Sequence, residues 1–181
     1  RLAAGSQRRY DRALALFEQN VDTEEFTRAL GLAHSAVVTP LMFEYQLLEK
    51  ARTSRKRIVL PEGNDDRVLK AAATVLTRGI ADLTILGEEA EVRGRAIELG
   101  IDLSAAQVLS PFDPVIVDRF AREYADLRRH KGVTYEQAAD TVTDVSYFGT
   151  MMVHLGLADG MVSGAAHTTA HTIRPAFEII K

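Results

Sequence analysis

The segment IVLPEGNDDRVLKAAATVLTRGIADLTILG, residues 58–87, contains the pattern that decides the fold. Its first apolar run, IVL, is too short for a helix and is typical of a buried strand. A helical pattern follows, in which Asn64 or Asp65 provides the N-terminal cap and Gly79 ends the helix. A second apolar run, LTILG from Leu83, predicts another strand. This order predicts two parallel strands joined by a crossover helix.

The same alternation continues to the end of the chain. The apolar runs QVLS from Gln107 and GMVSG from Gly160 predict two more strands, the last of which we expect to end at Ser163. We therefore predict an α/β fold with a mainly parallel sheet and helices on both faces. Ligands bind such sheets beyond the carboxyl ends of the strands. The loops PEGNDD and SGAAHTTA, after the first and fourth strands, are therefore the expected ligand-binding loops.

Capping residues mark where the later helices begin. Asp113 followed by Pro114 is typical of a helix start, and Thr134 with Gln137 forms a capping-box pattern. The segment SYFGTMMVHLGLA is apolar nearly all round and predicts a buried helix. Before the first strand, residues 1–38 predict a helical connector with one helix over 8–20 and a second, EEFTRALGL.

Composition limits the classes of protein. The chain has 181 residues, of which 22 are basic and 25 acidic, so its formal net charge is −3. This charge excludes a generally cationic nucleic-acid binder but leaves open a local basic patch. The lack of cysteine excludes disulfides, a thiolate nucleophile and a cysteine zinc site. No apolar run approaches the roughly 18 residues that cross a bilayer. The start, RLAAGSQRRY, has no initiating Met and no signal-peptide core, and we expect a cytoplasmic protein cut from a longer chain.

The most informative stretch is GMVSGAAHTTAHTIRPAFEIIK, residues 160–181. We expect a helix here whose first turn contains Arg174, preceded by a loop of small and hydroxyl residues. Small residues let the backbone approach a ligand, and free N–H groups at a helix start attract anions. Arg174 adds a planar donor fork suited to phosphate or carboxylate. The alternative is a tight turn with a solvated arginine. The candidate binding residues of the loop are Ser163, Gly164, His167, Thr168 and Thr169.

A second cationic segment is LRRHKG, residues 127–132. Lys, Arg and His favour helix C-termini because of the helix dipole, so a purely structural explanation is available. Arg128 follows Tyr124 by four residues, however, and should share part of the packed helix face rather than point straight into water.

The remaining candidates are weaker. His167 and His171 are four residues apart and could face each other, but no HExxH or similar spacing occurs, and we expect no metal. His154 lies in an apolar helix and is interpreted as a hydrogen-bonded core residue. Glu62, Asp65 and Asp66 could be catalytic carboxylates, although helix capping explains the aspartates. The chain has no GxGxxG and no GxxxxGK[ST] motif, which argues against dinucleotide and P-loop nucleotide binding.

Four stretches together resemble bacterial phosphate acetyltransferases, also called phosphotransacetylases. They are TPLMFEYQLLEKA, KRIVLPEGNDDRVLKAAA, RRHKGVTYEQAAD and YFGTMMVHLGLADGMVSGAAHTTAHTIRPAFEIIK. The resemblance implies a three-layer α/β/α lobe like that of isocitrate and isopropylmalate dehydrogenases. Residues 39–181 would be the first of two lobes, and residues 1–38 would be the connector that precedes them.

The resemblance also implies an activity, namely reversible acetyl transfer between acetyl phosphate and coenzyme A to give acetyl-CoA and phosphate. Arg128 and Arg174 match the family's two catalytic arginines, and the loop 163–169 would line the substrate cleft. Coenzyme A is then a substrate, with no separate cofactor, and a homo-oligomer is expected, without nucleic-acid or membrane partners. The family's general base lies outside this chain, so we expect the chain alone to be inactive. Two alternatives remain open: phosphate butyryltransferase, and a non-catalytic lobe that senses acyl-CoA or forms dimers.

Overall fold

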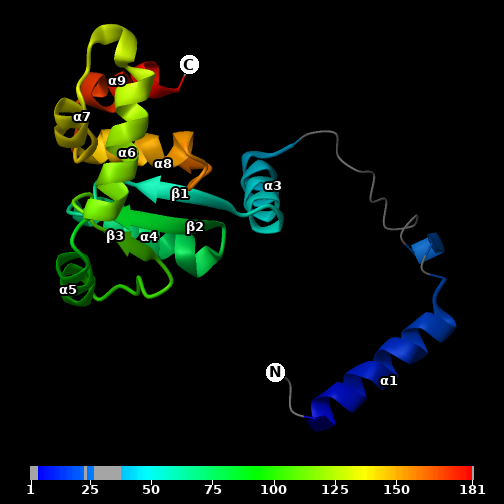
Figure 1. Ribbon diagram of the computed structural model, residues 1–181. Helices are drawn as coiled ribbons and strands as arrows, with labels where there is room; N and C mark the ends of the chain where they lie inside the picture. The colour runs from blue at the N-terminus through cyan, green and yellow to red at the C-terminus, as the bar shows by residue number, and fades with distance from the viewer. Residues whose placement is uncertain (1–3, 23, 27–37, 181) are drawn as a thin grey trace. The chain divides into compact units, whose positions relative to one another are not determined.

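The computed structural model describes residues 4–22, 24–26 and 38–180 (Figure 1). The chain divides into two compact units, Arg1–Glu44 and Tyr45–Lys181. In the part of the chain that is described, no helix is both long and apolar enough to cross a membrane.

The first unit contains the helix expected over 8–20, which is α1 (Ala4–Asn20). Residues 24–26 are also helical, and the rest of the second helix expected in the connector lies outside the described residues. The next helix, α3 (Pro40–Thr53), contains the division between the two units and has no buried residue.

The second unit is built on a four-stranded sheet in which every pair of neighbours is parallel. The strand order is β3-β2-β1-β4, so β1 is an inner strand with β2 on one side and β4 on the other. The direction of winding therefore reverses at β1, and such a reversal opens a crevice at the carboxyl ends of the strands. The strands are β1 (Lys56–Leu60), β2 (Ala81–Leu86), β3 (Gln107–Leu109) and β4 (Gly160–Met161).

All four predicted strands are present, but the last is shorter than expected. β4 ends at Met161 and not at Ser163. Only one further backbone bond extends the pairing, from the N–H of Val162 to the carbonyl of Val59 (3.0 Å). The chain then leaves the sheet, because the N–H groups from Gly164 onward bond to a side chain instead of to a strand.

Six helices and a 3-10 turn connect and cover the strands, and the caps of α4, α6 and α7 are those the sequence predicts. The Asp65 side chain accepts N–H bonds at the start of its helix, and Gly79 ends it in the left-handed conformation with φ 63°. Asp113 caps the helix that begins at Pro114, and Thr134 with Gln137 forms a complete capping box. The helices are α4 (Asp66–Arg78), α5 (Glu89–Leu99), α6 (Pro114–Leu127), α7 (Tyr135–Val142), α8 (Val145–His154) and α9 (Thr169–Ile179), with the 3-10 turn at Arg129–Lys131.

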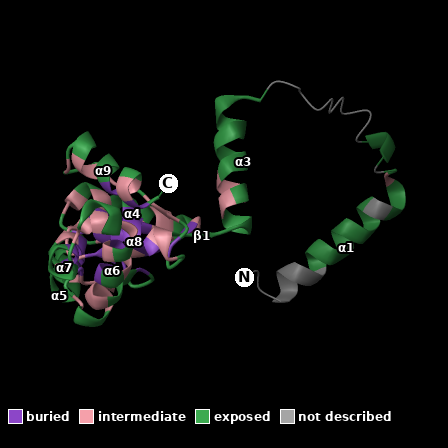
Figure 2. Ribbon diagram, turned by 45° about the horizontal axis from the view of Figure 1, so that its top comes forward, coloured by how far each residue is buried: buried purple, intermediate pink, exposed green. Residues whose placement is uncertain are grey.

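The two faces of the sheet bury two separate cores, which makes three layers. On one face, α4 and α5 pack against inward residues of β2 such as Leu83 and Ile85. On the other face, Val59 and Leu86 pack with α6, α7, α8 and α9 around Phe120. Figure 2 shows the buried residues gathered at the centre of this unit. The predicted α/β fold, with a parallel sheet covered by helices on both faces, is confirmed.

The last helix begins earlier than expected. Thr168 is its N-terminal cap and Thr169 its first residue, so Arg174 is the sixth helical residue and lies in the second turn. Pro175 lies inside the helix. The prediction that Arg174 stands in the first turn is therefore wrong. Proline is favoured in a first turn and suggested that start, but the Thr168 hydroxyl, which accepts the N–H of His171, fixes an earlier one.

Candidate functional site

Glu62 joins the two loops that the sequence singles out. It follows β1, and its side chain is only 2% exposed. Its carboxylate accepts the backbone N–H groups of four consecutive residues, Gly164 to His167, at 2.7–3.1 Å. The Nδ1 atom of His167 lies 2.9 Å from the same carboxylate. The two loops therefore meet at the reversal in strand order, and the N–H groups of the second loop bind an anion that belongs to the protein.

The protonation of Glu62 follows from these contacts. Burial acts to raise its pKa, but the N–H groups of Ala166 and Ala165 and the contacts with His167 act more strongly in the opposite direction. The pKa of Glu62 therefore lies below its ordinary value of 4.5. A carboxylate that stays ionised at neutral pH and uses both oxygens to hold the loop is poorly suited to act as a general base.

His167 and His171 face each other, as their spacing allows. Their ring centroids are 4.5 Å apart, and the Nε2 atom of His171 lies 2.8 Å from the Asp144 carboxylate. The described residues contain no group of three or more His, Cys, Asp or Glu side chains that could hold a metal ion. His154, interpreted as a hydrogen-bonded core residue, is partly buried and lies 3.1 Å from Glu123.

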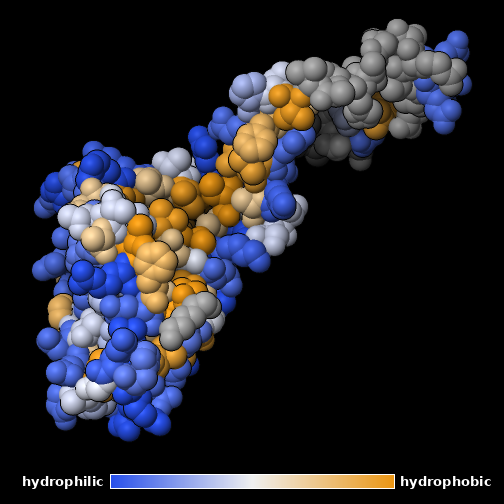
Figure 3. Space-filling model, turned by 90° about the horizontal axis from the view of Figure 1, so that it is seen from above, coloured by the Kyte–Doolittle hydropathy of each residue, from blue (hydrophilic) through white to orange (hydrophobic). Residues whose placement is uncertain are grey.

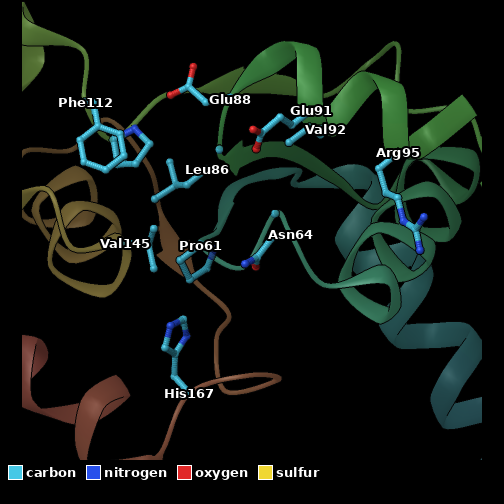
Figure 4. Close-up of a pocket in the computed structure, with 13 residues that line it drawn as sticks. Pro61, Asn64, Leu86, Glu88, Glu91, Val92, Arg95, Phe112, Val145 and His167 are labelled. Carbon is cyan, nitrogen blue, oxygen red and sulfur yellow. The ribbon is translucent and has the colours of Figure 1, made fainter. Parts of the chain in front are cut away.

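A cavity of about 500 Å³ opens at the carboxyl ends of β1, β2 and β3 (Figure 4). Figure 4 shows the ring of His167 pointing from its loop toward Pro61 and Val145 on one side of this cavity. Glu88 and Glu91 also line it, and its one arginine, Arg95, bonds to Asp66 at 2.7 Å. Two carboxylates and a paired guanidinium give this cavity no net attraction for a phosphate.

Arg174 is an arginine near the predicted loop that remains available to a ligand. It is exposed on α9, and among the described residues it has no hydrogen bond or ion pair within range. Together with Thr169, Ile173 and Phe177 it lines an open hollow of about 560 Å³. An unpaired guanidinium beside a hydroxyl can bind a phosphate without first breaking a bond within the protein.

Arg128 occupies a different environment. It follows the last residue of α6, and its side chain is only 18% exposed, which confirms that it shares the packed face of the helix. Its Nη2 atom lies 3.8 Å from Oε1 of Glu178, and its Nε atom is buried with no hydrogen-bond partner in the described structure.

The two arginines lie beside the same cluster of polar side chains. The hydroxyls of Tyr124 and Tyr147 both donate to Oε2 of Glu178, at 2.8 and 3.0 Å. Burial and the bond to Glu178 raise the pKa of Tyr147 to about 12, while the charge of Arg174 acts in the opposite direction. Burial likewise raises the pKa of Tyr124, against the charge of Arg128. Figure 1 shows α9 beside the end of α6, which brings residues 46 positions apart in the sequence to one cluster.

The predicted loop residues fall into three groups. Gly164, with φ 110°, and His167 are bonded to Glu62, so they hold the loop in place. Thr168 uses its hydroxyl to cap α9, and Thr169 shares the hollow with Arg174. Ser163 lies in a separate, largely apolar hollow between the sheet and α4, where its hydroxyl is buried with no partner in the described structure.

Sequence reasoning missed Glu178, Tyr124 and Tyr147 as parts of the site. The spacing of Glu178 and Arg174, four residues apart on one helix, places both on one face and was an available signal. The two tyrosines gave no such signal, because an apolar helix face accounts for them equally well.

The all-parallel sheet, with helices on both faces, and the hollow lined by Arg174 define a parallel α/β domain with a candidate anion site on α9. A family model described as phosphate acetyl/butaryl transferase matches residues 42–181, and the chain belongs to this family. The chain is 48% identical over 176 residues to the phosphate acetyltransferase of Nitratidesulfovibrio vulgaris, a match that covers 97% of this chain and 25% of that protein. It is 52% identical over 140 residues to the phosphate acetyltransferase of Corynebacterium glutamicum, covering 77% of this chain and 43% of that protein.

Solved structures agree with this assignment. A phosphotransacetylase from Streptococcus pyogenes matches with a TM-score of 0.75 at 40% identity, over 79% of this chain and 43% of that chain. The EutD phosphotransacetylase from Staphylococcus aureus matches with a TM-score of 0.67 at 38% identity, over 75% of this chain and 42% of that chain. The chain thus spans a quarter to less than half of the length of these relatives.

Proposed function

We propose that this chain supplies the phosphate-binding arginines of a phosphate acetyltransferase, which moves an acetyl group between acetyl phosphate and coenzyme A. The observation that carries the proposal is the placement of Arg174 on α9 and Arg128 at the end of α6 beside one Tyr–Glu cluster, with Arg174 unpaired within the described structure. Membership of the family supports it.

In the proposed reaction the thiol of coenzyme A attacks the carbonyl carbon of acetyl phosphate. A carbon–sulfur bond forms, the bond from the carbonyl carbon to the phosphate oxygen breaks, and phosphate leaves. A thiol is only a few per cent ionised at neutral pH, so a base that takes its proton assists the attack. Negative charge grows on the carbonyl oxygen and then on the phosphate, and Arg128 and Arg174 would stabilise it and hold the acyl phosphate in line. The resemblance assigns the base to a segment outside this chain.

The substrate would lie against α9 and the end of the loop that precedes it. The hydroxyl of Thr169 would assist Arg174 in binding the phosphate, since both residues line one hollow. Gly164 and His167 would contribute by keeping the loop bonded to Glu62. Coenzyme A enters as a substrate, and the proposed chemistry needs neither a metal nor a prosthetic group. We also propose a cytoplasmic homo-oligomer without nucleic-acid or membrane partners.

A thiol-consumption assay with acetyl phosphate and coenzyme A tests the proposal on the complete gene product and on this chain side by side. We expect turnover by the complete product and none by the chain alone. A hydrogen bond to a charged group contributes about 1.5–3 kcal/mol, so Arg174→Ala should lower kcat/KM by about 10–100-fold. Arg174→Lys should restore part of the loss, because lysine keeps the charge without the fork. Rates of Arg174→Ala within twofold of wild type would refute the assignment, and Arg128→Ala tests the other arginine in the same way.

The acyl group is a separate question, because the description of the matching family includes both acetyl and butaryl transfer. We propose acetyl, since the relatives compared above are named phosphate acetyltransferase or phosphotransacetylase. The same assay with butyryl phosphate decides between them: a higher kcat/KM for butyryl phosphate than for acetyl phosphate would favour the butyryltransferase.

A further inference from the structure

Glu178 faces Arg128, lies four residues after Arg174 on α9, and within the described structure accepts hydrogen bonds at only one of its two carboxylate oxygens. Its Oε2 atom accepts hydroxyl protons from Tyr124 (2.8 Å) and Tyr147 (3.0 Å). Its Oε1 atom makes no hydrogen bond among the described residues and faces Nη2 of Arg128 at 3.8 Å. One oxygen is therefore anchored, and the other is directed at a guanidinium.

The tyrosines form a rigid anchor. Tyr124 is 4% exposed on α6, Tyr147 comes from α8, and their rings pack edge to face with centroids 5.7 Å apart. Two hydroxyl bonds on one carboxylate oxygen fix the Glu178 side chain in one orientation and reduce its freedom to follow Arg128. Three helices thus determine where Oε1 lies.

The Arg128 guanidinium is held loosely by comparison. At 3.8 Å its contact with Glu178 is an ion pair that is too long for a hydrogen bond. Among the described residues Glu178 is its one ion-pair partner, and its side chain is 18% exposed. The pairing therefore orients the guanidinium by charge, while the N–H groups of its two Nη atoms, unlike the buried Nε, remain available to oxygen atoms of a ligand.

On the basis of the proposed function, we propose that Glu178 is a positioning residue for Arg128, with Tyr124 and Tyr147 holding the carboxylate that orients the guanidinium toward the substrate's phosphate. Glu178 itself would not touch the substrate, because its carboxylate and the substrate's phosphate are both negatively charged and would repel each other in direct contact.

The variant Glu178→Gln keeps the size of the side chain and an oxygen for the tyrosines but removes the charge that orients Arg128. In the complete gene product we expect kcat to fall about tenfold, since a misplaced guanidinium stabilises the transition state less well. We expect the KM for acetyl phosphate not to rise, because a negative charge near the phosphate has been removed. A raised KM with an unchanged kcat would overturn the proposal.

A double-mutant cycle separates positioning from a general structural effect. If Glu178 acts through Arg128, Glu178→Gln should lower kcat/KM about tenfold in the wild-type background but less than twofold in the Arg128→Ala background. Equal losses in both backgrounds would overturn the proposal. Tyr147→Phe, which removes one hydroxyl, should give a smaller loss with the same dependence on Arg128 and serves if Glu178→Gln does not fold. The control is Glu123→Gln, a carboxylate on α6 that contacts His154 and should leave kcat/KM within twofold.

A readout without turnover distinguishes the failure of this inference from the failure of the proposed function. Hydrogen exchange at Nε of Arg128, followed by NMR on the chain, should be slow because that atom is buried. We expect Glu178→Gln to speed this exchange at least fivefold and Glu123→Gln to leave it unchanged. A wild-type product without acetyl transfer would refute the proposed function alone, whereas unchanged exchange in Glu178→Gln would overturn the positioning role whatever the activity.

Discussion

At the scale of single residues, Glu62 shows how one buried carboxylate can organise a loop far away in the sequence. Its partners, residues 164–167, begin 102 positions later, and they satisfy both of its oxygens. Burying an ionised carboxylate is costly unless it is fully hydrogen-bonded. The five contacts with N–H groups and His167 meet that condition and keep the loop against the carboxyl end of β1.

We expect Glu62→Gln to destabilise the chain. An amide has one acceptor oxygen and presents an NH2 group to the remaining N–H donors, so at least two loop N–H groups lose their acceptor. The loss should lower the free energy of unfolding by about 2–4 kcal/mol, measured by urea denaturation with circular dichroism. The matched control is Glu98→Gln in the exposed pair with Arg95, which should change it by less than about 0.5 kcal/mol. A Glu62→Gln midpoint as high as that of the control would contradict this role for the carboxylate.

The same residue gives a prediction for pH. The pKa of Glu62 is lowered in the folded chain, so its contribution to stability is complete above the ordinary pKa of 4.5 and is lost as the pH falls through the lowered value. The difference in unfolding free energy between wild type and Glu62→Gln should therefore be constant from about pH 8 to 6 and shrink below about pH 4.5. Urea titrations of both proteins at several pH values from about 8 down to below about 4.5 measure this difference in unfolding free energy. A difference that grew on acidification would show that the direction of the pKa shift is wrong.

The role of a side chain could be predicted from the sequence where its hydrogen-bond partners lie only a few residues away along the chain. Asp65, Asp113 and Thr134 cap the helices that follow them, as their spacing indicates. Glu62 and Glu178 could not be assigned in this way, because their partners come from other elements and no short pattern links them. Among the candidate carboxylates, the sequence therefore explains Asp65, which caps α4, but neither Asp66, which bonds to Arg95 of α5, nor Glu62.

At the scale of elements, the loop after β1 is packed tightly against the end of β2. A Cβ atom at Gly63 would lie 2.3 Å from the carbonyl oxygen of Leu86 and 2.7 Å from a methyl group of Ile85. The carbonyl group of Leu86 belongs to backbone that is paired with Leu109 of β3, so it cannot move away without disturbing the sheet. Glycine is therefore required at this position, immediately beside Glu62.

Gly63→Ala should lower the free energy of unfolding by about 2–3 kcal/mol, because the added methyl group overlaps backbone. Gly94→Ala is the matched control, since Gly94 is exposed in α5 and a Cβ there meets nothing within 4 Å. Alanine is the better helix former, so the control should raise stability by about 0.5–1 kcal/mol. Urea denaturation of the two variants should move the midpoint in opposite directions, and a Gly63→Ala chain as stable as wild type would contradict the close packing.

Elements were predictable where their ends carry a signal and less so where tertiary contacts decide. The four strands were found from short apolar runs, yet β4 ends two residues before Ser163 because the loop N–H groups turn to Glu62. The start of α9 was misplaced because Pro175 resembles a first-turn proline, whereas the Thr168 cap lies about two turns before it. Both errors fall at the candidate site, where contacts between distant segments override local preference.

At the scale of the whole molecule, the hydrophobic core belongs to one unit. Every buried hydrophobic side chain among the described residues lies between Val59 and Ile179. Exposed apolar side chains occur in both units: in the first, Tyr10, Leu14 and Phe17 of α1, and in the second, Ile173 and Phe177 of α9. Figure 3 shows hydrophobic residues exposed among hydrophilic ones on the face seen from above.

This distribution leads to a prediction about the connector expected over residues 1–38. Hydrophobic burial dominates the stability of a domain, and the described part of that segment contributes no buried hydrophobic side chain. A chain that starts at Thr39 keeps the start of α3 and the whole of the sheet. It should unfold in urea with a free energy within about 1 kcal/mol of that of the 181-residue chain. Its circular dichroism should lose only the helical signal of the removed residues. A large loss of stability would mean that residues 1–38 belong to the folded lobe, and the division between connector and catalytic lobe would then have to be drawn elsewhere.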